Sequence, residues 1–336
     1  MNSLDQFQLD RNFKIIKRLI DQLQLDLTGI KILTEAGSNL FLYTPIIAAL
    51  ANAEKVFVWT KDSDYGSAKS IADQCQAIAV AFNLEIKLEI AINEQPISHL
   101  SSSNVITNSG NLRPLDQSKL KYISKNAVIP LMYEKWEFRN SDLDLEFCKS
   151  KGIKVAGTWE NYPGLEIFNY CEQLIIKLIF DAGFEIKSNK VVIFSSDHFG
   201  DLAEKGLTLL GATVVKTIDI DSVYKNIVDS DILLFCNYLD QRCLIGNDNS
   251  VFSIGKLKSL NDTLCIVHLT GNIDSDLVKR NGVYLYPNKR GYSQKMTETL
   301  NFLGSVPALS LLAAGLKVGE CLYKKVEHPI VQFLSK

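Results

Sequence analysis

The chain has 336 residues, 46% of them hydrophobic, and its 36 Lys and Arg against 38 Asp and Glu give a formal net charge of −2. One hydrophobic core rarely organises so many residues, so we expect two domains. Without a basic surface the protein does not attract phosphate backbones, which excludes nucleic acid as a partner. No uncharged apolar run reaches the ~18 residues of a membrane span, so we expect a soluble, cytoplasmic protein with no membrane partner.

The first half of the chain alternates short apolar runs with longer helical patterns, which is typical of a parallel sheet with crossover helices. After an amphipathic N-terminal helix, strands are predicted at 31–37, 55–61, 84–90, 104–110, 126–134 and 152–158, and helices at 43–53 and 67–83. This order predicts a doubly wound sheet, in which ligand-binding residues follow the carboxyl ends of the strands.

A second alternating series follows residue 150. A helix that is apolar on more than one face is predicted at 162–184, then a helix at 201–210 and strands at 190–196, 212–218, 231–237, 263–270 and 282–287. A Leu- and Ala-rich helix at 305–326 is expected to return to the first domain. The predicted fold class is α/β, with two doubly wound Rossmann-like domains around an interdomain cleft: residues 1–150 with the helix at 305–330, and residues 151–304.

Metal and redox roles find no support in the sequence. The seven cysteines include no Cys-x-x-Cys pair, and the four histidines lack the paired spacing of a zinc site. Most of the cysteines fall inside apolar helix or strand patterns, which favours buried, reduced thiols. We therefore expect no metal ion.

The order of elements in the middle of the chain resembles the D-2-hydroxyacid dehydrogenase family, which includes formate and phosphoglycerate dehydrogenases. The stretch KGIKVAGTWENYPGLEIFNYCEQLIIKLIFDAG (151–183), followed by KVVIFSSDHFGDLAEKGLTLLGATVV (190–215), carries this resemblance. In the family, a short strand and a long linking helix precede a Gly-x-Gly-x-x-Gly loop that binds a dinucleotide. The resemblance implies a substrate domain in residues 1–150, a nucleotide-binding domain in 151–304, a homodimer, and NAD or NADP as cofactor.

The predicted dinucleotide loop departs from the family pattern. Ser195, Asp197 and Gly200 stand where the family has three glycines, with Ser196, His198 and Phe199 between them. A carboxylate at the second position repels a pyrophosphate and keeps the backbone away from it. Two interpretations stay open: these residues contact a nucleotide through the helix amides and the serine hydroxyls, or Asp197 caps the helix that follows.

Three further positions of the nucleotide-binding domain bear on the chemistry. Asp219 or Asp221 lies where a dinucleotide enzyme presents an acid to the ribose, although Asp221 or Ser222 could equally cap the next helix there. The resemblance implies a catalytic arginine at the position of Thr270 and a catalytic histidine at Asn288. Since neither residue can replace those groups, ordinary 2-hydroxyacid chemistry is not expected.

Candidate catalytic residues remain at the ends of other predicted strands. Arg113 could clamp a carboxylate or phosphate, or could pair with Asp116. Glu134 could act as an acid or base, or could pair with Lys135. Lys289 lies beside the lost histidine position and could donate a proton, or could belong to a solvated basic turn.

These expectations together favour a divergent NAD(P)-dependent oxidoreductase-like protein that acts on a small polar metabolite in the interdomain cleft. One alternative is a non-redox enzyme, such as a lyase, an isomerase or a group-transfer enzyme that uses a nucleotide or sugar derivative. Another alternative is a catalytically silent nucleotide-binding or scaffold protein. Fold alone does not decide between them.

Overall fold

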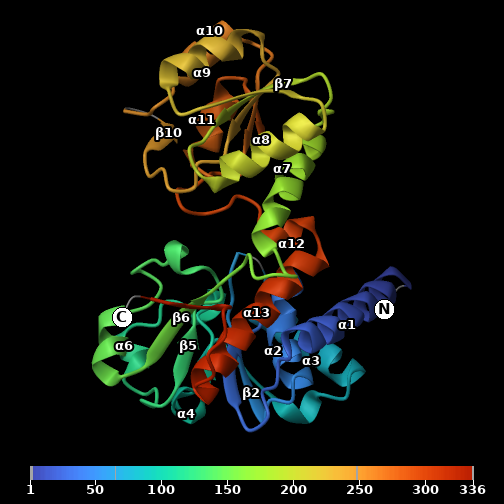
Figure 1. The fold of residues 1–336 in the computed structure, drawn as a ribbon, viewed down its shortest axis with the longest axis vertical. Coiled ribbons are helices and arrows are strands. Elements are labelled where there is room, and N and C mark those ends of the chain that lie inside the picture. The colour runs from blue at the N-terminus through green and yellow to red at the C-terminus, as the bar shows by residue number, and fades with distance from the viewer. Residues whose placement is uncertain (1–2, 65, 247–248, 335–336) are drawn as a thin grey trace. The chain divides into compact units, whose positions relative to one another are not determined.

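The computed structural model describes residues 3–64, 66–246 and 249–334, and these form two compact units. Unit 1 comprises residues 1–167 and 304–336, and unit 2 comprises residues 168–303 (Figure 1). Each unit is an α/β body with its own sheet and its own hydrophobic core, so each is described by itself.

Unit 1 is built on a seven-stranded sheet with the order β14-β6-β5-β4-β1-β2-β3. All neighbouring strands are parallel except β14, which pairs antiparallel with β6. Their bounds are β1 (Lys31–Glu35), β2 (Lys55–Thr60), β3 (Leu88–Ile92), β4 (Val105–Ile106), β5 (Val128–Pro130), β6 (Lys154–Thr158) and β14 (Val331–Phe333). Strands β1, β2 and β5 are almost entirely buried, because helices cover both faces of the sheet.

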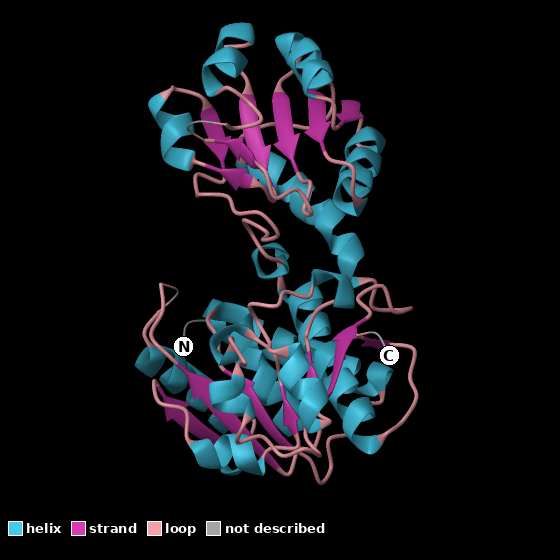
Figure 2. Ribbon diagram, turned by 90° about the vertical axis from the view of Figure 1, so that its left-hand side faces the viewer, coloured by secondary structure: helices cyan, strands magenta, loops and turns pink. Residues whose placement is uncertain are grey.

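The helices of unit 1 fall on two faces of this sheet (Figure 2). One face carries α1 (Ser3–Leu23), α2 (Tyr43–Leu50), α3 (Ala68–Ala81) and α13 (Ser305–Lys324), which contact one another. The other carries α4 (Ile97–Ser102), α5 (Gln117–Leu120) and α6 (Leu145–Lys151), whose apolar side chains share a core with Leu33, Ile106 and Ile129. Short 3₁₀ turns connect the elements at η1 (Asn39–Leu42), η2 (Glu85–Lys87), η3 (Gly110–Leu112), η4 (Lys135–Glu137) and η5 (Ile167–Asn169).

Helix α13 lies directly on the sheet because two of its residues have no side chain. A Cβ at Gly319 would lie 2.6 Å from the Cγ1 of Val105, and one at Gly315 would collide with Met132. Of the described helices, α13 is the one long and apolar enough to cross a membrane, yet 89% of its apolar window is buried inside unit 1. Helix α13 is therefore apolar because it forms part of the core of unit 1.

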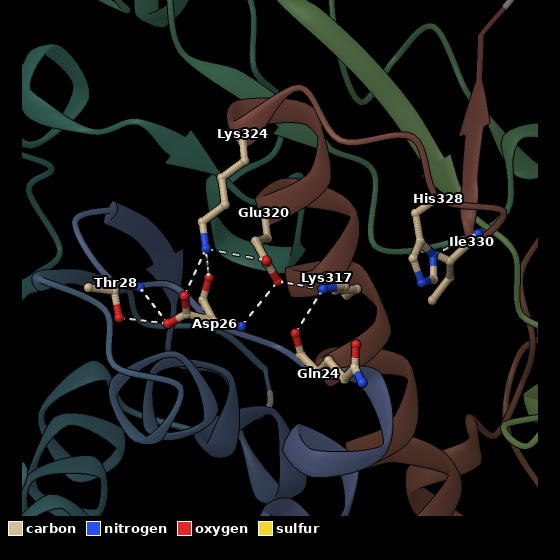
Figure 3. Close-up of polar contacts among 8 residues, drawn as sticks. All are labelled: Gln24, Asp26, Thr28, Lys317, Glu320, Lys324, His328 and Ile330. Atoms are coloured by element: carbon tan, nitrogen blue, oxygen red, sulfur yellow. Dashed lines mark hydrogen bonds and ion pairs between the residues drawn. The ribbon is translucent and has the colours of Figure 1, made fainter.

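A buried polar network fastens the far end of α13 to the segment that leads into β1 (Figure 3). The Lys317 ammonium donates to the Glu320 carboxylate and to the carbonyl of Gln24, at 2.9 Å each. Glu320 also accepts from the backbone N–H of Asp26 at 3.1 Å. Because both charged side chains of the Lys317–Glu320 pair are only 9% exposed, this pair is desolvated and depends on these partners.

Unit 2 is built on a five-stranded parallel sheet with the order β13-β11-β9-β7-β8. The strands are β7 (Lys190–Phe194), β8 (Thr213–Thr217), β9 (Ile232–Phe235), β11 (Cys265–His268) and β13 (Tyr284–Tyr286), and a separate short pair joins β10 (Cys243–Ile245) to β12 (Asn272–Ile273). Helices α7 (Tyr170–Asp181), α8 (His198–Leu209) and α12 (Leu300–Leu303) contact one another, and α8 lies against β7 and β8. Helices α9 (Ile220–Asn226), α10 (Ile254–Leu260) and α11 (Ser275–Arg280) share a core with the sheet, and η6 (Ile227–Asp229) follows α9.

The predicted fold class, two doubly wound α/β domains, is confirmed, while several boundaries differ from the prediction. Strand β6 pairs with β5, so it belongs to unit 1 and the first unit extends to Ile167 rather than to residue 150. The helix predicted at 162–184 begins only at Tyr170, because Tyr162, Pro163 and Gly164 form turns. Strands β10, β12 and β14 were not predicted.

Candidate functional site

Each sheet has one topological switch point, where ligands bind in open α/β folds. In unit 1 the chain runs from β1 outward through β2 and β3 on one side, and later places β4, β5 and β6 on the other side. In unit 2, β7 lies between β8 and β9 in the same way. Ligands bind outside the carboxyl ends of the strands at such points. The candidate positions are therefore the β1–β4 switch point of unit 1 and the β7–β9 switch point of unit 2.

Glu35 fills the β1–β4 switch point. It is the last residue of β1 and is only 5% exposed. Its carboxylate accepts a hydrogen bond from the backbone N–H of Asn111 at 2.6 Å and another from the hydroxyl of Ser109, both in the loop after β4. A side chain at Gly110 would collide with this carboxylate, so a glycine is needed there. Burial raises the pKa of Glu35, which makes it a candidate proton donor.

Arg113 lies beside this carboxylate, and a backbone carbonyl and an aromatic ring hold its side chain in place. Its Nε and Nη2 atoms donate to the carbonyl of Asn108 at 3.1 and 2.7 Å, and its guanidinium lies 4.8 Å from the centre of the Tyr133 ring. The alternative pairing with Asp116 is wrong: Arg113 approaches Asp142 instead, at 3.6 Å, and Asp116 caps α5. These contacts leave guanidinium hydrogens unused, and 24% of the side chain is exposed.

Several buried polar atoms at this edge of the sheet lack a hydrogen-bond partner among the described residues. They follow three different strands of unit 1: Trp59 Nε1 and Thr60 Oγ1 on β2, Asn108 Oδ1 after β4, and Thr158 Oγ1 and Asn161 Oδ1 at and after β6. Native proteins pair nearly all buried polar atoms, so each of these atoms marks a place where a ligand or ordered water completes the structure. Those on β2 and after β4 flank the end of β1, whereas those at and after β6 lie three strands away from it.

Glu134 is close to the same edge but is occupied. Its Oε2 atom accepts from the indole N–H of Trp136 at 2.8 Å, and its Oε1 atom accepts from the backbone N–H of Glu160 at 2.9 Å. The alternative in which Glu134 pairs with Lys135 is therefore wrong, because its two carboxylate oxygens accept from Trp136 and Glu160 instead. Glu160 itself was not among the predicted site residues, although it is only 6% exposed. A lone glutamate in a turn carries no sequence signal of burial.

Asp197 fills the β7–β9 switch point of unit 2. Its Oδ1 atom accepts from the backbone N–H groups of Phe199 and Gly200, at 3.1 and 3.4 Å, and from the hydroxyl of Ser195 at 2.9 Å. Its Oδ2 atom accepts from the backbone N–H of Tyr238, in the loop after β9. The sequence left two interpretations of Asp197 open, and the structure shows that it caps α8. This helix begins at His198 rather than after Gly200.

The residues of this loop do not fit the pyrophosphate of a dinucleotide. The amides that would bind it at the start of α8 already donate to Asp197, so a phosphate would have to displace a carboxylate of the same sign. Aromatic rings close the loop further: His198 stacks on Phe168 with 4.9 Å between ring centres, and Phe199 stacks on Tyr238 at 5.4 Å. Gly200 keeps a packing role, because a Cβ there would lie 2.6 Å from the Cβ of Ser195. Ser196 lies in the same turn.

Asp219, Thr270 and Lys289 complete the predicted residues of unit 2, and the Thr270 hydroxyl has no hydrogen-bond partner among the described residues. Asp219 caps α9 by accepting from the N–H groups of Asp221 and Ser222, so the cap expected at Asp221 or Ser222 is wrong by at least two positions. Thr270 is fully buried, and the Lys289 ammonium forms an ion pair with Glu298. The side chain of Lys289 is 60% exposed, in keeping with the basic-turn alternative.

His268 is a buried histidine at the end of β11, with no exposed surface. Burial lowers the pKa of its imidazole to about 4. The neutral ring donates from Nε2 to the carbonyl of Pro287 at 2.8 Å and accepts at Nδ1 from the hydroxyl of Thr297 at 3.0 Å. This histidine therefore ties two loops of unit 2 to its sheet.

Across the described ranges, no group of three or more His, Cys, Asp or Glu side chains is arranged to hold a metal ion. All seven cysteines are free thiols, and six of them are buried, with Cys243 partly exposed. Burial raises the pKa of the thiols of Cys75, Cys148 and Cys265 to about 12. Thiols of this kind are not nucleophiles at neutral pH.

Comparison with known proteins finds similarity in the fold. No family model matches the chain, and no curated protein matches it. Among solved structures, a dipicolinate synthase subunit from Bacillus halodurans superposes with a TM-score of 0.53 at 12% identity, covering 90% of this chain and 100% of that chain. The pyruvate reductase of Chlamydomonas reinhardtii gives a TM-score of 0.53 at 12% identity and covers 92% and 99%.

A third solved structure, NAD-dependent formate dehydrogenase from Staphylococcus aureus in complex with NAD, gives a TM-score of 0.48 at 11% identity, over 91% of this chain and 100% of that chain. Identities at this level show a shared fold and do not show a shared activity. The resemblance seen in the sequence is thus confirmed at the level of the fold, which this chain shares with the dipicolinate synthase subunit and the pyruvate reductase.

Proposed function

We propose that this protein is a divergent, oxidoreductase-like enzyme that binds a small polar metabolite at the β1–β4 switch point of unit 1. The observation that carries the proposal is the buried acid at the end of β1, with unpartnered polar atoms on β2 and after β4, the strands on either side of it. Fold similarity to dehydrogenases supports the class of protein, and the substrate site is inferred from this chain's own residues.

The proposed roles follow from the contacts of two residues. Arg113 is fixed by the Asn108 carbonyl and the Tyr133 ring, so its unused N–H groups are preorganised to bind a carboxylate of the substrate. Glu35 holds a proton more readily than an exposed glutamate, because burial raises its pKa, and can exchange that proton with the bound metabolite. Glu134 stays a candidate only if substrate binding releases it from Trp136. Lys289, which pairs with Glu298 in unit 2, has no role in this proposal.

NAD or NADP is the cofactor proposed from the fold, and the Asp197 loop predicts weak affinity for either. A non-redox enzyme is the second candidate, because Asp197 takes the helix amides and buried Thr270 replaces the family's arginine. Thermal-shift titration with NADH, NADPH and a nucleotide sugar distinguishes the two. Stabilisation by either dinucleotide supports the redox proposal, whereas stabilisation by the nucleotide sugar alone supports the second candidate.

Replacing Arg113 with methionine is expected to weaken the binding of small acids to unit 1 by at least about tenfold, since one charge-assisted contact is worth roughly 1.5–3 kcal/mol. The measurement is isothermal titration of the wild type and the variant with glycolate, D-lactate and pyruvate. Arg139→Met is the matched control, because Arg139 also pairs with Asp142, at 2.9 Å. Equal losses in the two variants, or a wild type that binds none of these acids, would contradict the proposed site.

A further inference from the structure

The carboxyl end of β2 carries a buried hydrogen-bond donor that lacks an acceptor. Trp59, near the end of this strand, is only 7% exposed, and its indole N–H has no partner among the described residues. Trp59 pairs in register with Glu35 on β1, so the two side chains lie next to each other on the same face of the sheet. This unpartnered donor is thus one strand away from the buried acid of the β1–β4 switch point.

Two ammonium groups lie close to the same indole ring. The Nζ atoms of Lys61 and Lys119 are 5.7 and 5.3 Å from the centre of the Trp59 ring, and both lysines are half-buried. Burial lowers the pKa of Lys119, and the nearby charge of Lys61 lowers it further. The ammonium of Lys61 has no hydrogen bond or ion pair among the described residues. Two positive charges therefore share this place.

Lys119 is held in place by the loop that also carries Arg113. Its ammonium donates to the carbonyls of Leu112 and Pro114, at 3.0 and 2.7 Å, and these are the residues on either side of Arg113. An ammonium group has three hydrogens, so one remains for a further acceptor. Asp116 acts on this ammonium through its charge, while its carboxylate caps α5.

The donors around the Trp59 ring need an acceptor that the neighbouring acid does not supply. The carboxylate of Glu35 accepts instead from the backbone N–H of Asn111 and from the hydroxyl of Ser109, in the loop after β4. An indole N–H and two ammonium groups suit the oxygens of a carboxylate or a phosphate, and charge-assisted hydrogen bonds of this kind are strong. A cation would be repelled by both lysines, so the partner that fits is an anion.

We propose that Lys61, Lys119 and the Trp59 N–H bind a second anionic group of the metabolite, so that the substrate is a small acid with two anionic groups. This inference rests on the proposed function, in which Arg113 binds the first acidic group. Either a carboxylate or a phosphate provides the oxygen acceptors that the second position lacks.

The two positions are close enough for one small molecule. Strands β4, β1 and β2 are neighbours about 4.8 Å apart, so residues after β4 and after β2 are separated by roughly 10 Å, and long Arg and Lys side chains shorten that gap. Burial raises the pKa of Glu35, and the charges of Arg113 and Lys61 both oppose this effect, so both cations lie near that carboxyl. A diacid bound across Glu35 can therefore reach Arg113 at one end and Lys61 at the other.

The first test compares acids that differ only at one end. Butanoate, succinate and 3-phosphonopropanoate share one carboxylate and carry a methyl, a carboxylate or a phosphonate at the other end. In isothermal titration, wild type should bind succinate or 3-phosphonopropanoate at least about tenfold more tightly than butanoate. The tighter of the two identifies the second group as a carboxylate or a phosphate. Lys61→Met should lose the preference and still bind butanoate through Arg113.

Lys55→Met is the matched control. Lys55 is the first residue of β2 and pairs with Glu89 at 3.3 Å, so its replacement removes the same charge from the opposite end of the same strand. This variant should keep the preference for the second anionic group. A preference lost in both Lys61→Met and Lys55→Met is a non-specific charge effect and overturns the site.

The second test follows the buried tryptophan. An anion that accepts from the Trp59 N–H changes the polarity around the indole, so succinate or 3-phosphonopropanoate should shift the tryptophan emission of the wild type. Trp59→Phe removes the N–H, keeps an aromatic ring and should lose the shift. Trp159→Phe is the control and should keep it, because Trp159 follows β6 on the other side of β1. A shift that persists in Trp59→Phe places the anion elsewhere and overturns the proposal.

The outcomes separate this inference from the function on which it rests. If butanoate binds as tightly as succinate and 3-phosphonopropanoate, or if the preference survives in Lys61→Met, the second anion site is overturned and the Arg113 site stands. A wild type that binds none of these acids overturns the proposed function, and this inference with it.

Discussion

Replacing Asp197 with glycine is expected to destabilise unit 2 and at the same time to tighten its binding of NADH. The change removes the acceptor of the Tyr238 N–H, which belongs to a residue only 5% exposed, and one of the two acceptors of the Ser195 hydroxyl, the other being the carbonyl of Cys236. Burying an unpaired donor costs about 1–3 kcal/mol, whereas glycine itself caps a helix almost as well as aspartate. Chemical denaturation measures this loss directly.

The gain in NADH affinity has a separate physical cause. Without the carboxylate, the N–H groups of Phe199 and Gly200 at the start of α8 lose their acceptor and carry the positive end of the helix dipole. Removing a like charge from the phosphate position is expected to lower the dissociation constant for NADH by at least about tenfold. Fluorescence titration with NADH, and with inorganic pyrophosphate as competitor, gives the two constants.

Asp219→Gly is the matched control for this experiment. Asp219 also caps a helix in unit 2, but its two hydrogen bonds, at 3.3 and 3.2 Å, stay within the first turn of α9 and reach no other strand. Its replacement by glycine should cost only a few tenths of a kcal/mol and leave NADH affinity unchanged. If Asp197→Gly also leaves NADH affinity unchanged, the Ser195–Gly200 turn is no derivative of a dinucleotide loop.

Breaking the Lys317–Glu320 pair of unit 1 is expected to have the larger effect on stability. Replacing either partner alone, as in Lys317→Met or Glu320→Gln, breaks an ion pair whose two side chains are only 9% exposed, on the helix that covers the sheet (Figure 3). Single losses of this kind cost about 3–5 kcal/mol. The double variant Lys317→Met/Glu320→Met should recover much of that loss, because an apolar pair suits this position.

Urea denaturation of the two single variants and the double variant forms a double-mutant cycle that measures the coupling. Lys149→Met is the control in the same unit. Lys149 pairs with Glu146 at 2.8 Å, but the two side chains are 51% and 83% exposed, so the loss should stay below about 1 kcal/mol. Single variants that cost no more than Lys149→Met would mean that the Lys317–Glu320 pair contributes nothing to the fold.

Sequence periodicity was sufficient to predict the class of fold and the positions of the loops that follow the strands at the two switch points. The alternation of apolar strands with helical patterns predicted both doubly wound sheets, because burial on both faces of a parallel strand leaves a continuous apolar run. The same alternation placed Arg113 and Asp197 after strands, at the edge where α/β proteins bind ligands. These are local properties, since each depends on neighbours within a few residues.

What each acid does was decided only by the tertiary structure. Glu35 meets the amide of Asn111, which is 76 residues away, and Asp197 meets that of Tyr238, which is 41 residues away. Each pair forms because the switch point of a sheet brings the ends of two strands together that are distant in the chain. Burial of Glu160 beside Glu134 and the assignment of β6 to unit 1 likewise depend on pairing between strands, which no pattern within a single segment encodes.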